Sequence, residues 1–228
     1  PPEPFYGNVL SAMCTPDLKG TQGSFSFYTT RRSNDSARVT GGDVKVVKRQ
    51  GDTIHTEIEG PPDPKNPGKY LGCPFSITLH QFEKKATLKV GAKSHSLRVE
   101  EFSPWIEVEF PFGFRKKISG IVRFCLRELS PEFSLYASPV NINPEKPCLP
   151  IAQPIFFATW LAKRLGLFGT LGLMEDTWGR NEHALDDRRF LDQSYLNHGE
   201  REKMFMDALD RTREGLCACV FDASDRIQ

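Results

Sequence analysis

The residues that are best suited to bind a ligand or take part in catalysis lie in residues 215–228, GLCACVFDASDRIQ. Residues 216–221 form an apolar run that is too short for a helix and is typical of a strand buried on both faces. A polar turn follows, and Asp225 and Arg226 begin a predicted helix. Open α/β sheets bind ligands beyond the carboxyl ends of their strands, so we expect this turn and the Asp225 carboxylate to lie where a ligand could bind. The same carboxylate could instead cap the helix.

A second candidate is the stretch FPFGFRKK, residues 110–117, which places aromatic rings beside cations. A ring such as Phe112 can stack on a base or sugar, and a cation such as Arg115 can hold a phosphate. Rings at the end of a strand can also pack into the core, which is the interpretation we favour. Phe112 and Arg115 remain candidate substrate contacts.

Asp17 is a third candidate, because it follows a proline within the sequence PDLKG. A carboxylate at this position could contact a substrate. The same residues are also ordinary turn chemistry, in which Asp accepts hydrogen bonds from the backbone and Gly supplies a positive φ. We favour the turn.

Three segments resemble, in the same order, motifs of the alkaline phosphatase superfamily, in its type I phosphodiesterase/nucleotide pyrophosphatase-like branch of phosphohydrolases and phosphomutases. Residues 14–25, CTPDLKGTQGSF, resemble its G-x-P-D-x-x-G-T-x-G-x-F segment. Residues 170–178, TLGLMEDTW, resemble T-L-G-x-x-E-D-T-W. Residues 225–228, DRIQ, match the first four positions of D-R-x-Q-H. The middle of the chain resembles the family poorly.

The resemblance implies that Asp225 binds a catalytic metal together with a histidine directly after Gln228. Residues four apart share one face of a helix, so such a pair can hold one cation. Arg226 would contact the substrate or pair with a carboxylate. The parent enzyme would use two divalent cations, zinc or manganese.

The family also requires an early metal-binding Asp, a Ser or Thr nucleophile and later Asp-His and His ligands, and none of these can be assigned here. We therefore expect an internal fragment of a metal-dependent phosphoric-ester hydrolase, which supplies a substrate-selecting cap and one metal-binding carboxylate. The fragment alone should be inactive and bind no metal. Its partners would be the phosphate-ester substrate and the remainder of the parent polypeptide.

Two other classes of function remain open. A non-catalytic β-sandwich module could bind carbohydrate, nucleotide or protein through Trp105, Phe112 and Phe114. An interaction scaffold would instead present a contiguous apolar patch, for example as a homodimer interface at the exposed edge of the fragment.

Periodicity places these candidates on an α+β fold. Residues 1–23 form an extended segment. Residues 24–140 alternate apolar and polar positions, which predicts an antiparallel, sandwich-like cap domain. Residues 141–150 are a Pro-rich linker. Residues 151–228 form a partial α/β, metal-binding segment.

Two helices are predicted in this last segment. One lies near residues 154–165 and ends at Gly166. The other begins at a capping box of Asn197 and Glu200 and runs through Arg213.

Composition adds little to these assignments. The net charge of +1 predicts no nucleic-acid polymer as a partner, and no run is long and apolar enough for a membrane segment. The six cysteines are scattered, mostly among apolar residues, which is typical of reduced thiols and favours a cytoplasmic location.

Overall fold

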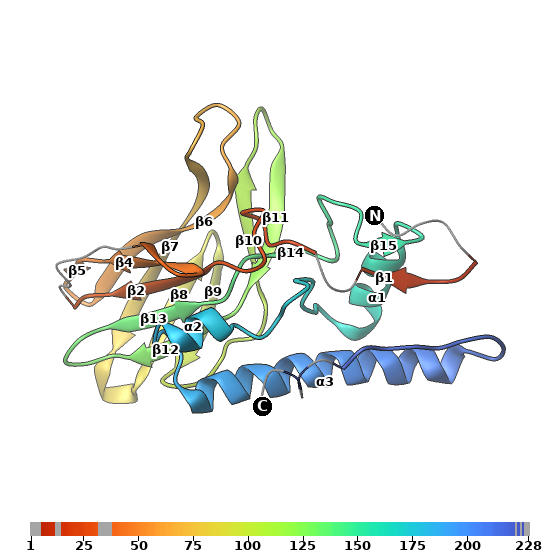
Figure 1. Cartoon of the computed structure of the whole chain (residues 1–228). Coiled ribbons are helices and arrows are strands. Elements are labelled where there is room, and N and C mark those ends of the chain that lie inside the picture. Colours follow the sequence, from red (N-terminus) through yellow and green to blue (C-terminus); the bar gives the residue numbers. More distant parts are fainter. Residues whose placement is uncertain (1–5, 12–14, 32–37, 222, 224, 226–228) are drawn as a thin grey trace.

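The computed structural model describes residues 6–11, 15–31, 38–221, 223 and 225 of the chain. A strand-rich part is followed by a part with three α-helices, and the sheets are mostly antiparallel (Figure 1). The predicted α+β class is therefore confirmed. Its finer description as a sandwich stays a prediction.

One five-stranded sheet is an antiparallel meander. Strands that are neighbours in this sheet are also neighbours in the sequence, because turns and short loops connect them. The predicted alternation holds here, since residues such as Ile54, Ile77 and Leu88 are fully buried between exposed neighbours. The elements are β5 (Arg49–Gln50), β6 (Thr53–Pro62), β7 (Tyr70–His80), the 3-10 helix η1 (Gln81–Glu83), β8 (Lys85–Val90) and β9 (Lys93–Arg98).

Residues 60–68 are rich in Gly and Pro, which predicts an exposed loop, but β6 continues as far as Pro62. The β6–β7 ladder shifts register after Glu59 and resumes where Pro62 pairs with Tyr70. Gly60 is buried in β6, where a Cβ atom would lie 2.4 Å from the ring of Phe110. Because glycine has no Cβ atom, β6 can pack closely against the Phe110 ring of β10 at this point. The strand therefore continues into the Pro-rich stretch.

A second five-stranded sheet has the order β12-β13-β2-β4-β3. Its β2–β4 pair is parallel, so the expectation of purely antiparallel strands was wrong at this pair. Tyr28 contacts Phe75 edge to face at 5.2 Å, and Phe75 contacts Phe124 at 5.5 Å, which joins the two large sheets through one core. The strands are β2 (Phe25–Thr29), β3 (Arg38–Val39), β4 (Gly42–Val46), β12 (Phe124–Glu128) and β13 (Ser134–Ala137).

Two smaller sheets complete the strand-rich part: β10-β11-β14 and β1-β15. Asn141 and Ile142 are buried in β14, so the predicted linker at residues 141–150 begins as part of a sheet. The β6–β7 and β10–β11 hairpins project from the same side of the molecule (Figure 1). The strands are β1 (Val9–Leu10), β10 (Ile106–Pro111), β11 (Lys117–Val122), β14 (Asn141–Ile142) and β15 (Ala152–Gln153).

The helices are α1 (Phe157–Leu165), α2 (Thr177–Asn181) and α3 (Asp187–Arg211). Helix α1 ends at Gly166, as predicted, where φ is +96°. Helix α3 begins ten residues before the predicted capping box, because the Asp186 carboxylate already accepts a hydrogen bond from the Arg189 amide and no proline interrupts the run. Among the described residues, no helix combines the length and apolarity needed to cross a membrane.

The side chain of Glu200 fastens α3 to the strand-rich part. Its Oε1 accepts hydrogen bonds from Trp105 Nε1 at 2.7 Å and Arg123 Nη2 at 2.5 Å, and its Oε2 accepts one from the Gly169 amide at 2.8 Å. The Arg123 guanidinium also lies 4.5 Å from the centre of the Trp105 ring. The polar atom and one ring face of Trp105 are therefore used within the fold, while its side chain stays partly exposed.

Candidate functional site

The run at residues 216–221 is not a strand. After α3 the chain turns at Gly215 and runs back along the helix (Figure 1), with Leu216 90% and Val220 66% exposed. The Phe221 ring contacts His198 at 5.1 Å and Phe205 at 5.9 Å. The prediction of a buried strand was wrong for the described residues because such a strand needs hydrogen-bonded neighbours on both sides, and none of the four described sheets takes up this run.

Asp225 follows this run and is itself exposed and helical, so it does not lie at the end of a strand. The described residues contain no group of three or more His, Cys, Asp or Glu side chains placed to hold a metal ion. Arg226, the second predicted residue of this motif, lies outside the described residues. Asp225 as a metal ligand stays a prediction that needs further ligands beside it.

Asp17 has the geometry of the predicted turn. Its Oδ1 accepts from the Thr21 amide at 2.8 Å, while Oδ2 accepts from Thr21 Oγ1 at 2.8 Å and the Ser24 amide at 2.9 Å. Burial raises the pKa of Asp17 above its ordinary value, and the hydrogen bonds from Thr21 and Ser24 oppose that rise. Both carboxylate oxygens are used to order the loop, which favours the turn over a substrate contact.

Lys19, in the same loop, is a buried cation that no sequence pattern identified. Its Nζ lies 2.6 Å from Asp43 and 3.1 Å from Glu59, and 5.0 Å from the centre of the Tyr70 ring. Burial alone would lower the pKa of Lys19, but the hydrogen bond and charge of Asp43, with the charge of Glu59, raise it above its ordinary value. The ion pairs connect the loop to β4 and β6.

Phe112 and Arg115 lie at the tip of the β10–β11 hairpin, between Pro111 and Lys117. Phe110 is fully buried as expected, but Phe112 is 38% and Phe114 85% exposed, so packing of these two rings into the core was the wrong expectation. Both rings lie beyond the last β10–β11 pair, Pro111 with Lys117, and no described strand pairs with the chain there. Residues 216–221, which we call the returning segment, lie on the opposite side of the molecule from this tip (Figure 1). The structure therefore does not bring Phe112 and Arg115 together with Asp225.

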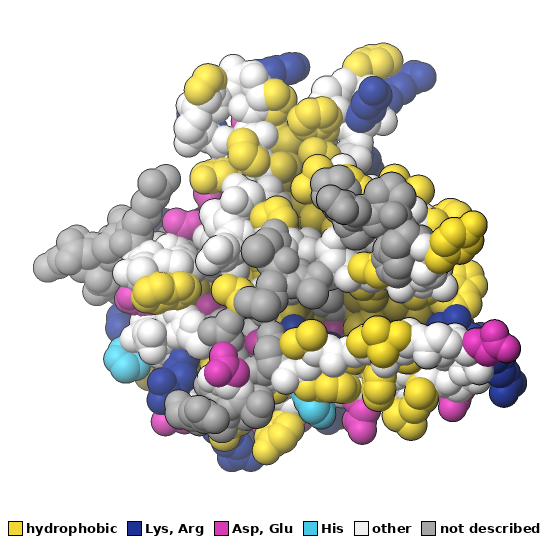
Figure 2. Space-filling model, turned by 45° about the vertical axis from the view of Figure 1, so that its right-hand side comes forward, with side chains coloured by type: hydrophobic (Ala, Val, Ile, Leu, Met, Phe, Trp, Pro, Cys, Tyr) yellow, Lys and Arg dark blue, Asp and Glu magenta, His cyan; other side chains and the backbone are white. Residues whose placement is uncertain are grey.

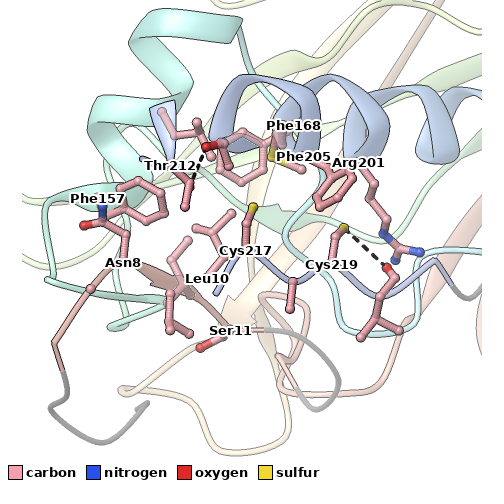
Figure 3. A pocket seen from close by; sticks show the side chains of 18 of the residues that line it. Asn8, Leu10, Ser11, Phe157, Phe168, Arg201, Phe205, Thr212, Cys217 and Cys219 are labelled. Carbon is pink, nitrogen blue, oxygen red and sulfur yellow. Dashed lines mark hydrogen bonds between the residues drawn. The ribbon is translucent and has the colours of Figure 1, made fainter. Parts of the chain in front are cut away.

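A cavity of about 710 Å³ lies between α3, α1 and residues 215–220 (Figure 3). Leu10, Phe157, Phe168 and Phe205 contribute apolar side chains to its walls. Charged side chains also line it, among them Glu200, Arg201 and Arg211. The predicted core residues Cys217 and Cys219 instead line this cavity, and Cys219 is exposed.

Glu175 and Asp176, in the second motif segment, are both buried but in different surroundings. The Tyr136 hydroxyl donates to Asp176 Oδ2 at 2.6 Å, and the Gly179 amide donates to Oδ1 at 2.7 Å. Burial raises the pKa of Asp176 to about 6. The Glu175 carboxylate is fully buried, lies 3.9 Å from Arg201 Nη1, and accepts no hydrogen bond from the described residues.

The segments that carry the first two motif resemblances lie side by side. The Gly172 amide donates a hydrogen bond to the Thr15 carbonyl at 2.9 Å. A Cβ atom on Gly23 would lie 3.2 Å from the Leu171 side chain. In addition, Asn141 Oδ1 accepts from the amides of Thr170 and Leu171, at 2.8 and 2.9 Å. Two segments from opposite ends of the chain thus form one packed unit.

Sequence reasoning found the segments of this unit but not its internal contacts. The Asp176–Tyr136 hydrogen bond and the Glu200 contacts join residues distant in the sequence. From the sequence, only the residue types indicate such contacts. A Trp or Tyr among apolar residues needs a hydrogen-bond partner for its N–H or O–H group, but the sequence does not identify that partner. Comparisons with known proteins found no family model, no curated protein and no solved structure that matches this chain.

Proposed function

We propose that this chain is part of a metal-dependent phosphoric-ester hydrolase similar to the type I phosphodiesterase/nucleotide pyrophosphatase branch of the alkaline phosphatase superfamily. It supplies a cap, residues 24–140, that selects the substrate, and one metal-binding carboxylate, Asp225. The observation that carries the proposal is the contact between the segments that resemble the family, through Gly172 and Thr15. Motif matches that arise by chance in unrelated surface loops have no reason to pack together.

The exposure of residues 216–221 gives further support. A run as apolar as LCACVF has a favourable transfer free energy into a core, yet the Leu216 side chain is 90% exposed. Further strands beside this run would bury it and pair its backbone groups, which is the setting of a strand in an α/β sheet. Asp225 would then follow the end of that strand, where such sheets bind ligands.

The described residues do not fit a catalytic metal site by themselves. Asp225 is one exposed carboxylate without a second ligand among the described residues, and such a group binds a divalent cation weakly. The proposal therefore assigns the remaining ligands and the nucleophile to other parts of the complete polypeptide. Its metals would be two divalent cations, with zinc or manganese as the expected ions.

The test is metal-dependent hydrolysis of bis(p-nitrophenyl) phosphate by the complete polypeptide of the reading frame that contains this chain. Asp225→Asn should lower kcat/KM by at least about a hundredfold, because it removes a metal ligand. Asp210→Asn, on an exposed position of α3, should stay within about twofold of the unaltered protein. The present chain alone should show no turnover.

Two results would count against the proposal. The first is robust metal-dependent turnover by the present chain alone, since one ligand cannot hold a catalytic cation. The second is a complete polypeptide in which Asp225→Asn and Asp210→Asn behave alike.

A non-catalytic binding module is the second candidate, and the exposure of Phe114 favours it. A ring that is 85% exposed at a hairpin tip contributes little to the core and is available for contacts with another molecule. The ligands of such a module would be carbohydrate, nucleotide or protein, each of which can stack on or pack against an aromatic ring.

A further inference from the structure

We propose that the tips of the β6–β7 and β10–β11 hairpins dock onto an anionic phospholipid surface. The term hairpin tips denotes residues 63–69 and 112–116. Binding to a lipid surface does not depend on phosphate-ester hydrolysis, so each of the two proposals can be wrong while the other is right. It begins from the position of the two tips, which project together from one side of the molecule, away from α3 (Figure 1).

The backbone of both tips is held by internal hydrogen bonds. In the first, the Asp63 amide donates to the Lys69 carbonyl at 2.8 Å, and the Asp63 carboxylate accepts from the Lys65 amide at 2.9 Å. In the second, the Phe112 amide donates to the Lys116 carbonyl at 2.8 Å, and Gly113 has a φ of +72°. Ordered tips present their side chains without a large entropic cost on binding.

The charge of the hairpin tips is positive. Lys65, Lys69, Arg115 and Lys116 are exposed, and none of the four forms an ion pair with a carboxylate of a described residue. The only acidic residue of the tips, Asp63, uses its carboxylate to cap the loop through the Lys65 amide and the Asn66 side chain. Cations placed this way are attracted to a negatively charged surface, although the chain as a whole has a net charge of only +1.

Apolar side chains stand beside these cations. Phe114 and Phe112 are exposed, and the Arg115 guanidinium lies 5.2 Å from the centre of the Phe114 ring. Figure 2 shows hydrophobic side chains together with Lys and Arg on both projections. A ring that enters the headgroup region while neighbouring cations contact lipid phosphates combines apolar burial with charge attraction.

The shape of the tips favours a lipid surface over single-stranded nucleic acid. A strand of nucleic acid binds along a groove in which successive bases stack on aromatic rings. The rings here lie on a protrusion, and neither cavity described includes a residue of the hairpin tips. Two adjacent protrusions can contact a flat surface at the same time, which is the geometry that a bilayer requires.

The experiment is cosedimentation of the chain with vesicles of phosphatidylcholine alone and with vesicles of equal parts phosphatidylcholine and phosphatidylserine. We expect at least about tenfold tighter binding to the anionic vesicles, weakened by added salt. Phe112→Ser with Phe114→Ser should remove most of this binding. Phe82→Ser is the control, because Phe82 is an exposed ring that lies away from the tips, at the β7–β8 turn.

A second pair of variants tests the charge. Arg115→Gln with Lys116→Gln should weaken binding to the anionic vesicles by about tenfold, whereas Lys48→Gln with Lys89→Gln, at exposed positions away from the tips, should not. Thermal unfolding of each variant verifies that the fold is intact. Equal binding by tip and control variants, or no binding to anionic vesicles, would overturn the proposal. Tip-dependent binding of single-stranded RNA in place of vesicles would assign the surface to nucleic acid instead.

Discussion

At the scale of single residues, Asp176 shows how the fold sets a charge state. Its carboxylate is buried with the Tyr136 hydroxyl and the Gly179 amide as hydrogen-bond donors. The donors favour the ionised form, but removal from water disfavours it more, and the pKa rises to about 6 from an ordinary value of 3.8. Because the folded protein holds this proton more tightly than the unfolded chain does, the contribution of Asp176 to stability is greatest below pH 3.8 and declines as the pH rises toward 6.

Replacing Asp176 by Asn should remove this decline. Between about pH 4 and about pH 7, the free energy of unfolding of the variant should rise relative to the unaltered protein by about 2 kcal/mol, since each pKa unit corresponds to about 1.4 kcal/mol and part of the decline lies below pH 4. Urea unfolding at a series of pH values measures the difference. Asp187→Asn, at an exposed position, is the control. Parallel pH profiles for Asp176→Asn and the unaltered protein would refute the assignment.

Glu200 shows a different use of a buried carboxylate, since it is paired. Glu200→Gln should lower the free energy of unfolding by about 1–3 kcal/mol, because it leaves the Arg123 guanidinium, whose side chain is 10% exposed, without a counter-charge. Urea unfolding tests this, with exposed Glu202→Gln as the control. If the unpaired cation is the cause, adding Arg123→Met to Glu200→Gln should recover part of the loss. A double variant that is less stable than Glu200→Gln would contradict this cause.

At the scale of elements, sequence periodicity predicted much of the strand-rich part. Alternation of apolar and polar residues identified β6, β7, β8 and β10. Each of these strands has one face in the core, with apolar side chains, and one face toward solvent, with polar side chains. Gly166 likewise marked the end of α1, because its φ of +96° is a conformation that glycine adopts readily.

The failures at this scale have one physical origin. The run at residues 216–221 has the composition of a buried strand, but burial depends on partners that composition does not reveal. Asn197 with Glu200 has the form of a capping box, but the Asp186 carboxylate had already begun the helix upstream. The Phe114 ring is exposed because the β10–β11 hairpin is longer than the sheet beside it. In each case the tertiary neighbours, not the local residues, decide the outcome.

The candidate site was predictable only in part for the same reason. The motif order along the chain pointed to residues 14–25 and 170–178, and the structure packs the described part of the first segment against the second. The hydrogen bonds that fill this unit, such as Tyr136 to Asp176, join residues that carry no shared local pattern. The metal site implied by the resemblance needs ligands that no spacing within this chain supplies.

At the scale of the whole molecule, the two proposals place different tasks on opposite sides. The returning segment with Asp225 lies beside α3, whereas the hairpin tips project from the other side (Figure 1). A protein attached to a lipid surface through the tips would therefore leave the returning segment free to meet further strands. The two assignments are compatible in space, and each can fail without the other.

The central claim is that residues 216–221 form a buried strand, followed by Asp225, in the complete polypeptide. Hydrogen exchange of the amides of residues 217–221 tests this directly, in the present chain and in the complete polypeptide. We predict fast exchange in the present chain, where these residues have no strand partners among those described, and exchange at least about a hundredfold slower in the complete polypeptide. Equally fast exchange in both would contradict the claim and, with it, the placement of Asp225 at a strand end.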